Sequence, residues 1–224
     1  MQAIVLAGGF GTRLQSVVSD LPKPMAPIND KPFLVYIMNQ LKKAGFTKVV
    51  LAVGYKKECI IDYFGNTYLG MDVVYSNEDQ PLGTGGAIKK AFSLIDEEYA
   101  FIVNGDTYFN IDFRKLMIDK DVVIACKYMK DFDRYGKVEI SNGRIVEFQE
   151  KKHNDEGYIN GGIYYFKMDV FSRYDLEEKF SLEKDLFEKY INQIEIYASC
   201  SDDYFIDIGI PQDYFKAQED FKNE

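Results

Sequence analysis

The 224-residue sequence has no tryptophan, one histidine and three cysteines. The cysteines, Cys59, Cys126 and Cys200, are odd in number and never paired as CxxC, which argues against a disulfide framework and favours reduced thiols in a cytoplasmic protein. The single histidine, His153, lies in the charged stretch EKKHNDE, where we expect it at the surface. A mechanism built on histidine is therefore not expected.

Long apolar runs and an excess of basic residues are also missing. No run approaches the length that spans a membrane, and the N-terminal MQAIVLA lacks the basic segment of a signal peptide. Acidic residues outnumber basic ones, 36 against 27, for a net charge of −9. This charge argues against nucleic acid or a membrane surface as the main partner, although a local pocket can still bind a phosphate group.

The residues that are present predict one globular α/β domain. An apolar content of 46% and an aromatic content of 15% supply a core for a chain of this length. Two helical patterns alternate with short apolar runs in the first half, up to about residue 120, which predicts a parallel sheet covered by helices. The predicted strands there are 3–7, 48–53, 71–76 and 99–104, and the helices are 33–45 and 85–95.

The second half, from about residue 121, is richer in hairpins. The Asn-Gly pair at 142–143 is a strong hairpin signal. Strands are predicted at 121–129, 137–141, 144–150, 158–167, 194–199 and 204–209, with helices near 181–191 and 211–222. No linker separates the halves, so we expect a single domain over residues 1–224.

The stretch LAGGFGTRL at residues 6–14 joins the first strand to the rest of the chain. Glycine at 8, 9 and 11 allows backbone amides to face one concavity, an arrangement that binds anions. The stretch does not continue to the GK[ST] of a P-loop, and it lacks the third glycine of a dinucleotide fingerprint. Taken alone, it leaves a tight turn and a phosphate cradle both open.

The following stretch, LPKPMAPI at 21–28, places Lys23 between two prolines. Proline fixes its own backbone and restricts the residue before it, so the lysine is presented from a stiff segment. A lysine ammonium is a point charge with three donors, which suits phosphate oxygens. The combination favours a phosphate-binding loop over a solvated surface lysine.

These two stretches together resemble the signature of the sugar-1-phosphate nucleotidyltransferases. Further blocks match the family in order, namely QPLGTGGA, NGDTYF, FQEK, NGG and DIGIP. SVVSDLPKPMAPI, PLGTGGAIKKA and NGDTYF are most similar to the family's D-glycero-D-manno-heptose 1-phosphate guanosyltransferases. The resemblance implies a Rossmann-like, mostly parallel sheet flanked by helices. Residues 1–120 would bind the nucleotide, and residues 121–224 would form a hairpin-rich sugar-binding half.

The resemblance also implies roles for single residues. A sugar phosphate oxygen attacks the α-phosphorus of a nucleoside triphosphate and expels pyrophosphate, so catalysis rests on positioning and charge neutralisation. Arg13 would neutralise the leaving pyrophosphate, and Lys23 the charge at the α-phosphate. Asp106 and Asp207, each just beyond a predicted strand, would hold Mg²⁺, which prefers oxygen ligands. The expected nucleotide-binding residues are Leu6, Ala7, Gly8, Gly9, Gly11, Thr12, Gly83, Thr84, Gly85 and Gly86. The expected sugar-phosphate-binding residues are Tyr135, Glu150, Lys151, Asn160 and Gly161.

The expected partners are a nucleoside triphosphate, preferably GTP, and a sugar 1-phosphate, preferably a manno-configured heptose. The product would serve capsule, lipopolysaccharide or surface-layer synthesis. Three alternatives keep the chemistry but change a substrate: a uridylyltransferase, a thymidylyltransferase and a mannose-1-phosphate guanylyltransferase. A non-catalytic relative that only binds nucleotide sugar is a fourth, disfavoured by the intact Arg13, Lys23, Asp106 and Asp207. The sequence leaves open whether the protein forms a homodimer.

Overall fold

The computed structural model describes residues 1–9, 14, 17–18 and 20–222. Gly11, Thr12 and Arg13 of the glycine-rich stretch lie outside the described residues, so their predicted roles stay predictions. None of the described helices is long and apolar enough to cross a membrane.

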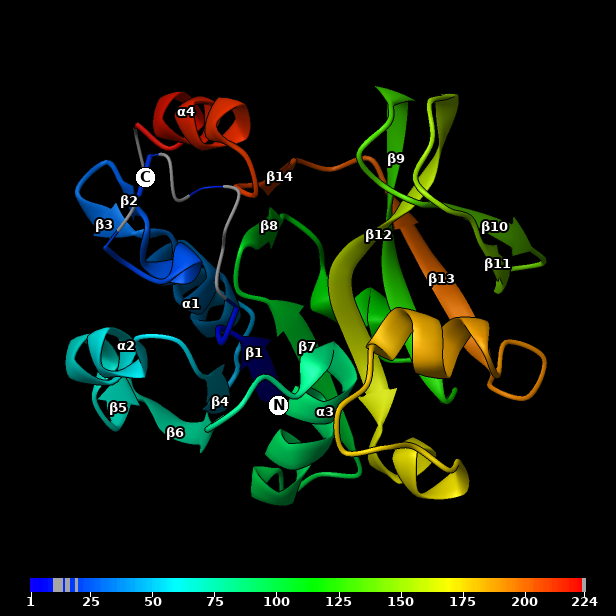
Figure 1. Cartoon of the computed structure of the whole chain (residues 1–224), viewed down its shortest axis with the longest axis horizontal. Coiled ribbons are helices and arrows are strands. Elements are labelled where there is room, and N and C mark those ends of the chain that lie inside the picture. Colours follow the sequence, from blue (N-terminus) through cyan, green and yellow to red (C-terminus); the bar gives the residue numbers. More distant parts are fainter. Residues whose placement is uncertain (10–13, 15–16, 19, 223–224) are drawn as a thin grey trace.

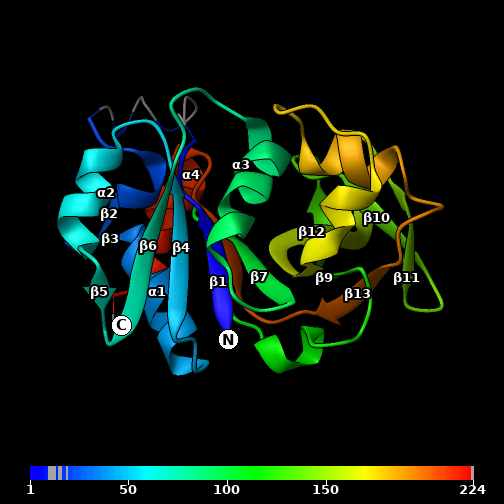
Figure 2. The same ribbon diagram turned by 90° about the horizontal axis from the view of Figure 1, so that it is seen from below.

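A ten-stranded mixed sheet forms the centre of the described chain (Figure 1). Its strand order is β10-β11-β13-β9-β12-β7-β1-β4-β6-β5, and Figure 2 shows β6, β4, β1 and β7 side by side from below. Two further pairs, β2–β3 and β8–β14, lie outside it. The strands are β1 Gln2–Leu6, β2 Pro27–Ile28, β3 Lys31–Pro32, β4 Lys48–Val53, β5 Thr67–Tyr68, β6 Met71–Asn77, β7 Tyr99–Asn104, β8 Thr107–Phe109, β9 Val122–Phe132, β10 Lys137–Ser141, β11 Arg144–Phe148, β12 Asn154–Lys167, β13 Ile196–Ser201 and β14 Phe205–Asp207.

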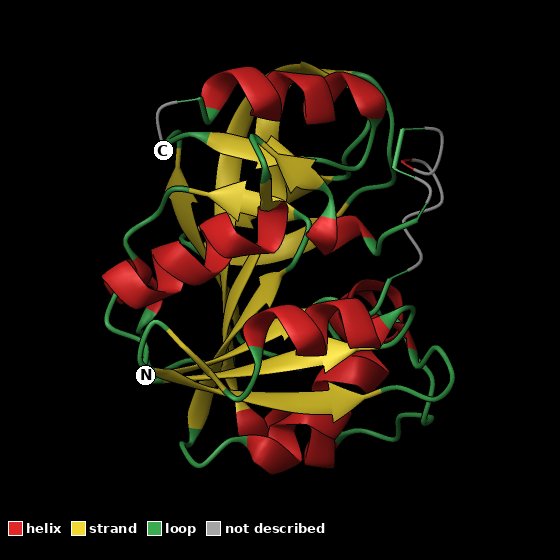
Figure 3. Ribbon diagram, turned by 90° about the vertical axis from the view of Figure 1, so that its left-hand side faces the viewer, coloured by secondary structure: helices red, strands yellow, loops and turns green. Residues whose placement is uncertain are grey.

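Helices pack around the strands (Figure 3). The α-helices are α1 Phe33–Lys43, α2 Lys57–Phe64, α3 Gly83–Ala91 and α4 Pro211–Asp220. Short 3₁₀ helices span Lys23–Met25, Phe92–Leu94, Phe113–Leu116 and Met168–Arg173, and a π-helix spans Leu182–Glu188.

Side-chain alternation along β1 divides the core between the two faces of the sheet. Ala3 and Val5 join a cluster with the apolar face of α1 and with Phe221 just after α4. Ile4 points the other way, into a cluster with Ile88 of α3 and Leu186 of the π-helix. Both faces are therefore covered, which is why the central strands are apolar at nearly every position.

The two halves of the chain share this sheet. β1 pairs in parallel with β4 and β7, and β4 with β6, as the alternating pattern predicted. β12 then pairs antiparallel with β7 on one side and with β9 on the other. The hairpin predicted at 142–143 joins β10 to β11, with Asn142 and Gly143 both at positive φ.

Local pattern did not reveal every element. The predicted order of the first half omitted α2, which is short and buries only Ile60 and Phe64, so its apolar periodicity is weak. The predicted helix near 181–191 is a π-helix over Leu182–Glu188, and the predicted strand at 204–209 is reduced to Phe205–Asp207 in a separate two-stranded pair.

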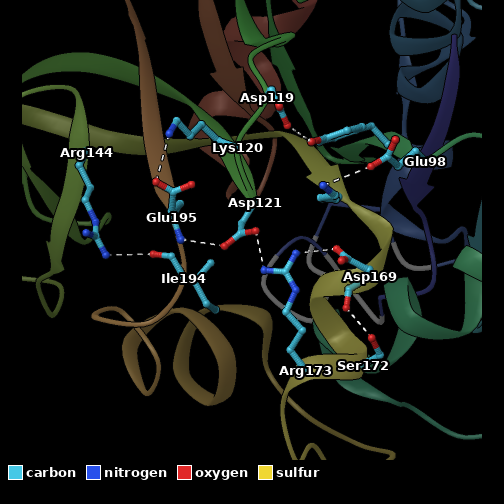
Figure 4. A network of polar contacts seen from close by, with 12 residues as sticks. Glu98, Asp119, Lys120, Asp121, Arg144, Asp169, Ser172, Arg173, Ile194 and Glu195 are labelled. Carbon is cyan, nitrogen blue, oxygen red and sulfur yellow. Dashed lines mark hydrogen bonds and ion pairs between the residues drawn. The ribbon is translucent and has the colours of Figure 1, made fainter.

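A network of polar contacts lies at the amino ends of β7, β9 and β13 (Figure 4). Arg173 binds Asp121 at 2.6 Å and Asp169 at 2.7 Å. Asp121 also accepts a hydrogen bond from the Glu195 amide at 3.0 Å. The network joins the 3₁₀ helix Met168–Arg173 to this end of the sheet, and the opposite, carboxyl ends of β7 and β1 are left for a ligand.

Candidate active site

The carboxyl ends of β1 and β7 meet at one point of the sheet edge. Leu6 is the register partner of Asn104, and the Gly105 amide donates to the Leu6 carbonyl at 2.9 Å. A Cβ atom on Gly105 would lie 2.5 Å from that same oxygen, so only glycine permits the approach. Asp106 therefore emerges beside the glycine-rich stretch, at the position where parallel sheets bind ligands.

Lys23 reaches this point from the 3₁₀ helix Lys23–Met25, whose backbone is constrained by Pro22 and Pro24. Its Nζ atom lies 2.6 Å from Asp106 Oδ2 and 3.4 Å from Asp207 Oδ1. The lysine side chain is only 11% exposed. The structure thus brings together three residues that the sequence separates by up to 184 positions.

Asp207 arrives through the small β8–β14 pair. Asp207 is the register partner of Thr107, and the Ile208 amide donates to the Asp106 carbonyl at 3.1 Å. Asp207 Oδ1 also accepts a hydrogen bond from the Gly209 amide at 2.6 Å. Burial, and then the charge of Asp106, raise the pKa of Asp207, while Lys23 opposes the rise.

The two carboxylates fit a divalent cation. Both carboxylates already contact the Lys23 ammonium, at 2.6 and 3.4 Å, so a positive charge at this point offsets their mutual repulsion. No group of three or more potential protein ligands occurs among the described residues. An ion here would therefore complete its shell with substrate oxygens and water, which is the usual mode for Mg²⁺.

A cavity of about 410 Å³ opens on one side of Lys23 and Asp106. Its lining includes five of the residues predicted to bind a nucleotide: Leu6, Gly8, Gly9, Gly83 and Thr84. Ala7, also predicted, is fully buried, and its amide donates to the Ala52 carbonyl at 2.8 Å. It continues the sheet and does not line the cavity.

Gly85 and Gly86 were also predicted to bind the nucleotide, and the structure shows their amides engaged within the protein. Both donate to the Phe180 carbonyl, at 3.1 and 3.4 Å. A Cβ atom would lie 2.1 Å from the Phe180 ring at Gly85 and 2.4 Å from the Glu178 carbonyl at Gly86. These glycines are needed for close packing of α3 against residues 178–180, and their donors are already used.

Glu78 is a cavity residue that sequence reasoning missed. It lies just beyond β6, half-buried, with Oε2 accepting a hydrogen bond from the Leu82 amide at 3.1 Å. Oε1 would lie 2.7 Å from a Cβ atom placed on Gly8. Burial raises its pKa. Its position at the carboxyl end of a parallel strand was the available signal, since ligand-binding side chains gather there.

A second cavity, of about 210 Å³, opens on the other side of the Lys23 contacts. All five residues predicted to bind the sugar phosphate line it, together with Asp207: Tyr135, Glu150, Lys151, Asn160 and Gly161. Asn104 lines both cavities. The cavities therefore meet at the end of β7, beside Asp106.

An irregularity in β12 shapes the floor of the second cavity. The register with β9 shifts between Asn160 and Tyr164, and the Gly162 amide folds back to donate to Asn160 Oδ1 at 3.0 Å. A Cβ atom on Gly161 would lie 2.6 Å from the Phe109 ring. The bulge therefore packs closely on Phe109, while Asn160, Gly161 and Gly162 line the cavity.

Several further residues of the second cavity were missed, among them Glu183, Lys184 and Glu188 of the π-helix. Sequence periodicity did not predict that these residues share one face, because a π-helix is too rare to be predicted from pattern. His153, as expected, lies at the surface with its side chain 65% exposed.

Comparisons with known proteins agree with this geometry. The sequence profile of the nucleotidyl transferase family matches residues 2–224. A D-glycero-α-D-manno-heptose 1-phosphate guanylyltransferase from Aneurinibacillus thermoaerophilus is 51% identical, over 100% of this chain and 99% of its own. One from Campylobacter jejuni is 50% identical, over 96% of this chain and 97% of its own.

Among solved structures, HddC from Yersinia pseudotuberculosis complexed with GMP-PN superposes with a TM-score of 0.88. It is 37% identical and covers 98% of this chain and 99% of its own. The match spans both halves of the sheet, so the predicted fold class is confirmed. By its sequence, its fold and its full-length relatives, this chain belongs to the nucleotidyl transferase family.

Proposed function

We propose that this protein transfers GMP from GTP to D-glycero-D-manno-heptose 1-phosphate, releasing pyrophosphate and forming a GDP-heptose. The observation that carries the proposal is the contact of Lys23 with Asp106 and Asp207 where two cavities meet. One cavity would hold the nucleotide and the other the sugar phosphate. The α-phosphorus and the attacking oxygen would then meet at the junction.

The side chains at the junction suit this chemistry. Attack on the α-phosphorus brings together several negative charges, and Lys23 is positioned to neutralise part of that charge. Its stiff backbone and low exposure hold the ammonium in place, so little reorganisation is needed during reaction. Asp106 and Asp207 would hold a divalent cation, Mg²⁺ in our proposal. When bound, it would orient the phosphate oxygens and neutralise their charge.

Glu78 supports guanine as the base. Guanine presents a ring N–H and an exocyclic amine side by side, and one carboxylate accepts both hydrogen bonds. Glu78 lies in the nucleotide cavity, is held by the Leu82 amide and is partly removed from water. Adenine, uracil and thymine lack this pair of adjacent donors and would leave the carboxylate unsatisfied.

The names of the full-length relatives support the heptose acceptor. We propose the cytoplasm as the place of reaction and surface-glycan synthesis as the consumer of the product. The cavity linings support residues 1–120 as the nucleotide half and residues 121–224 as the sugar half of one domain.

The direct test is pyrophosphate release with GTP, ATP, CTP, UTP and dTTP, each combined with the 1-phosphates of the heptose, mannose and glucose. We expect the highest kcat/KM for GTP with the heptose phosphate. An enzyme fastest with UTP or dTTP would refute the guanylyltransferase assignment.

A Glu78→Gln variant tests the base assignment separately. The amide replaces one acceptor by a donor, so discrimination in favour of GTP over UTP should fall by about 1–3 kcal/mol. An unchanged GTP preference would show that Glu78 does not select the base.

A further inference from the structure

We propose that Glu183 and Glu188 are specificity-determining residues that bind the hydroxyl groups at the far end of a heptose acceptor. The inference rests on the proposed function, since it assumes that the second cavity takes a sugar 1-phosphate. Both residues line that cavity and belong to the π-helix Leu182–Glu188.

The π-helix explains how two residues five positions apart share one wall. In a π-helix the hydrogen bonds join residues five apart, so Glu183 and Glu188 lie one turn from each other on the same side. In a regular α-helix the residue on the same side would be three or four positions away. Leu182, Leu186 and Phe187 of the same helix are buried, and the Phe187 ring stacks on Phe148 at 5.7 Å.

Glu183 is held in place before any ligand arrives. Its Oε1 accepts a hydrogen bond from Asn160 Nδ2 at 2.8 Å, which joins the π-helix to the cavity floor. The preceding Leu182 amide donates to Thr84 Oγ1 at 3.0 Å. A carboxylate can accept several hydrogen bonds, so one that is already oriented can receive a sugar hydroxyl at little entropic cost.

Glu188 faces other charged groups at the cavity mouth. Partial burial and the charges of Glu150, Glu183 and Asp185 raise its pKa, while Lys184 opposes the rise. Lys184 Nζ lies 3.9 Å from Glu150 Oε1. A carboxylate in these surroundings repels phosphate and favours hydroxyl donors.

The direction of the acceptor decides which hydroxyls meet this wall. Its phosphate must face the Lys23–Asp207 junction, where its oxygen attacks. The π-helix lies well away from β14, the strand that carries Asp207 (Figure 1). The end of the sugar farthest from the phosphate therefore points to Glu183 and Glu188. A heptose differs from a hexose at that end, by one additional hydroxyl-bearing carbon.

The test compares kcat/KM for the heptose and mannose 1-phosphates with saturating GTP in Glu188→Leu and Glu183→Gln variants. Leucine removes the acceptor at similar volume, and glutamine keeps an oxygen for Asn160. We expect each change to lower kcat/KM for the heptose phosphate by about 10-fold or more, the effect of losing a hydrogen bond to a charged group. The value for mannose 1-phosphate should change less than about threefold. Glu219→Leu, on the exposed face of α4, is the matched control and should change neither.

The outcomes separate the two proposals. A wild-type protein that turns over neither acceptor with GTP refutes the proposed function. A wild-type protein active on the heptose phosphate, with variants that lose both acceptors equally or neither, refutes the specificity role alone. If Glu188→Leu does not fold, as judged by its thermal melting, the test uses Glu183→Gln and Glu188→Gln. The quantity compared is again kcat/KM for the heptose phosphate relative to mannose 1-phosphate.

Discussion

At the scale of single residues, the site depends on charges held where water is scarce. Lys23 contacts two carboxylates while its side chain is 11% exposed. Its ammonium therefore acts in a setting where Coulomb interactions are stronger than in water. The charge of Lys23 also opposes the rise in the pKa of Asp207 that burial and Asp106 cause.

Replacing Lys23 by alanine should lower kcat more than it weakens GTP binding. The charge of Lys23 matters most as the α-phosphorus is attacked, so its loss should reduce kcat by about 10²–10³-fold. Steady-state kinetics with varied GTP measure both quantities. A rise in KM with kcat unchanged would contradict the role proposed for Lys23.

We predict that Glu78→Gln stabilises the ligand-free protein by an amount that depends on pH. Burial raises the folded-state pKa of Glu78. Its contribution to stability is therefore present below its ordinary pKa and lost as the pH rises through the folded value. The variant should melt at a higher temperature than the wild type at pH 8, and the difference should shrink toward pH 4. Melting curves at both pH values check this, and a constant difference would contradict it.

At the scale of elements, the start of α3 and residues 178–182 form one packed unit. The Phe180 amide donates to the Leu82 carbonyl at 3.0 Å, and its carbonyl accepts from Gly85 and Gly86. Thr84 accepts from Leu182 at 3.0 Å. This unit joins Gly83 and Thr84, which line the first cavity, to the π-helix, which lines the second cavity. The walls of both cavities therefore depend on the same packing contacts.

Gly86→Ala should destabilise this unit. The new Cβ would lie 2.4 Å from the Glu178 carbonyl oxygen, and backbone cannot move aside as a flexible side chain can. Chemical denaturation should show a loss of about 1–3 kcal/mol in the free energy of unfolding. Gly9→Ala is the control, because nothing lies within 4 Å of its added Cβ. Equal stability of the two variants would rule out the packing argument.

At the scale of the whole molecule, the sheet crosses from one half of the chain to the other. β12 of the second half lies between β7 of the first half and β9. The Tyr36 ring of α1 packs against Phe221 at 4.6 Å, and Tyr214 of α4 donates to the Pro27 carbonyl at 2.7 Å. Neither half can close its core without the other.

We therefore expect the whole chain to unfold as one cooperative unit. Cys59 in the first half and the buried Cys126 in the second are natural probes. Their exposure to a thiol reagent should rise at the same urea concentration, and a fragment of residues 1–120 should show no cooperative transition. Two separate transitions would indicate two independent domains.

Much of the fold follows from local sequence. The apolar runs of β1, β4, β6 and β7 and the helical periodicity of α1 are set by side-chain period, which acts over a few residues. The hairpin turn at Asn142-Gly143 is likewise set locally, by the preference of these two residues for positive φ. The sequence also indicated Lys23, because its two prolines constrain the neighbouring backbone directly. Fold class and family were predictable on these grounds and on the family's motifs.

The family resemblance predicted that Asp106 and Asp207 share a site, but only the tertiary structure shows how these distant residues reach Lys23. Asp207 reaches Lys23 through the three-residue β14, too short to be paired with β8 from pattern alone. The contact of the Gly85 and Gly86 amides with the Phe180 carbonyl joins residues almost a hundred positions apart, which local pattern does not indicate. Glu78 and the carboxylates of the π-helix carried no periodic signal. The physical reason is range: propensity and turn preferences act between neighbours in the chain, whereas these contacts depend on how whole elements pack.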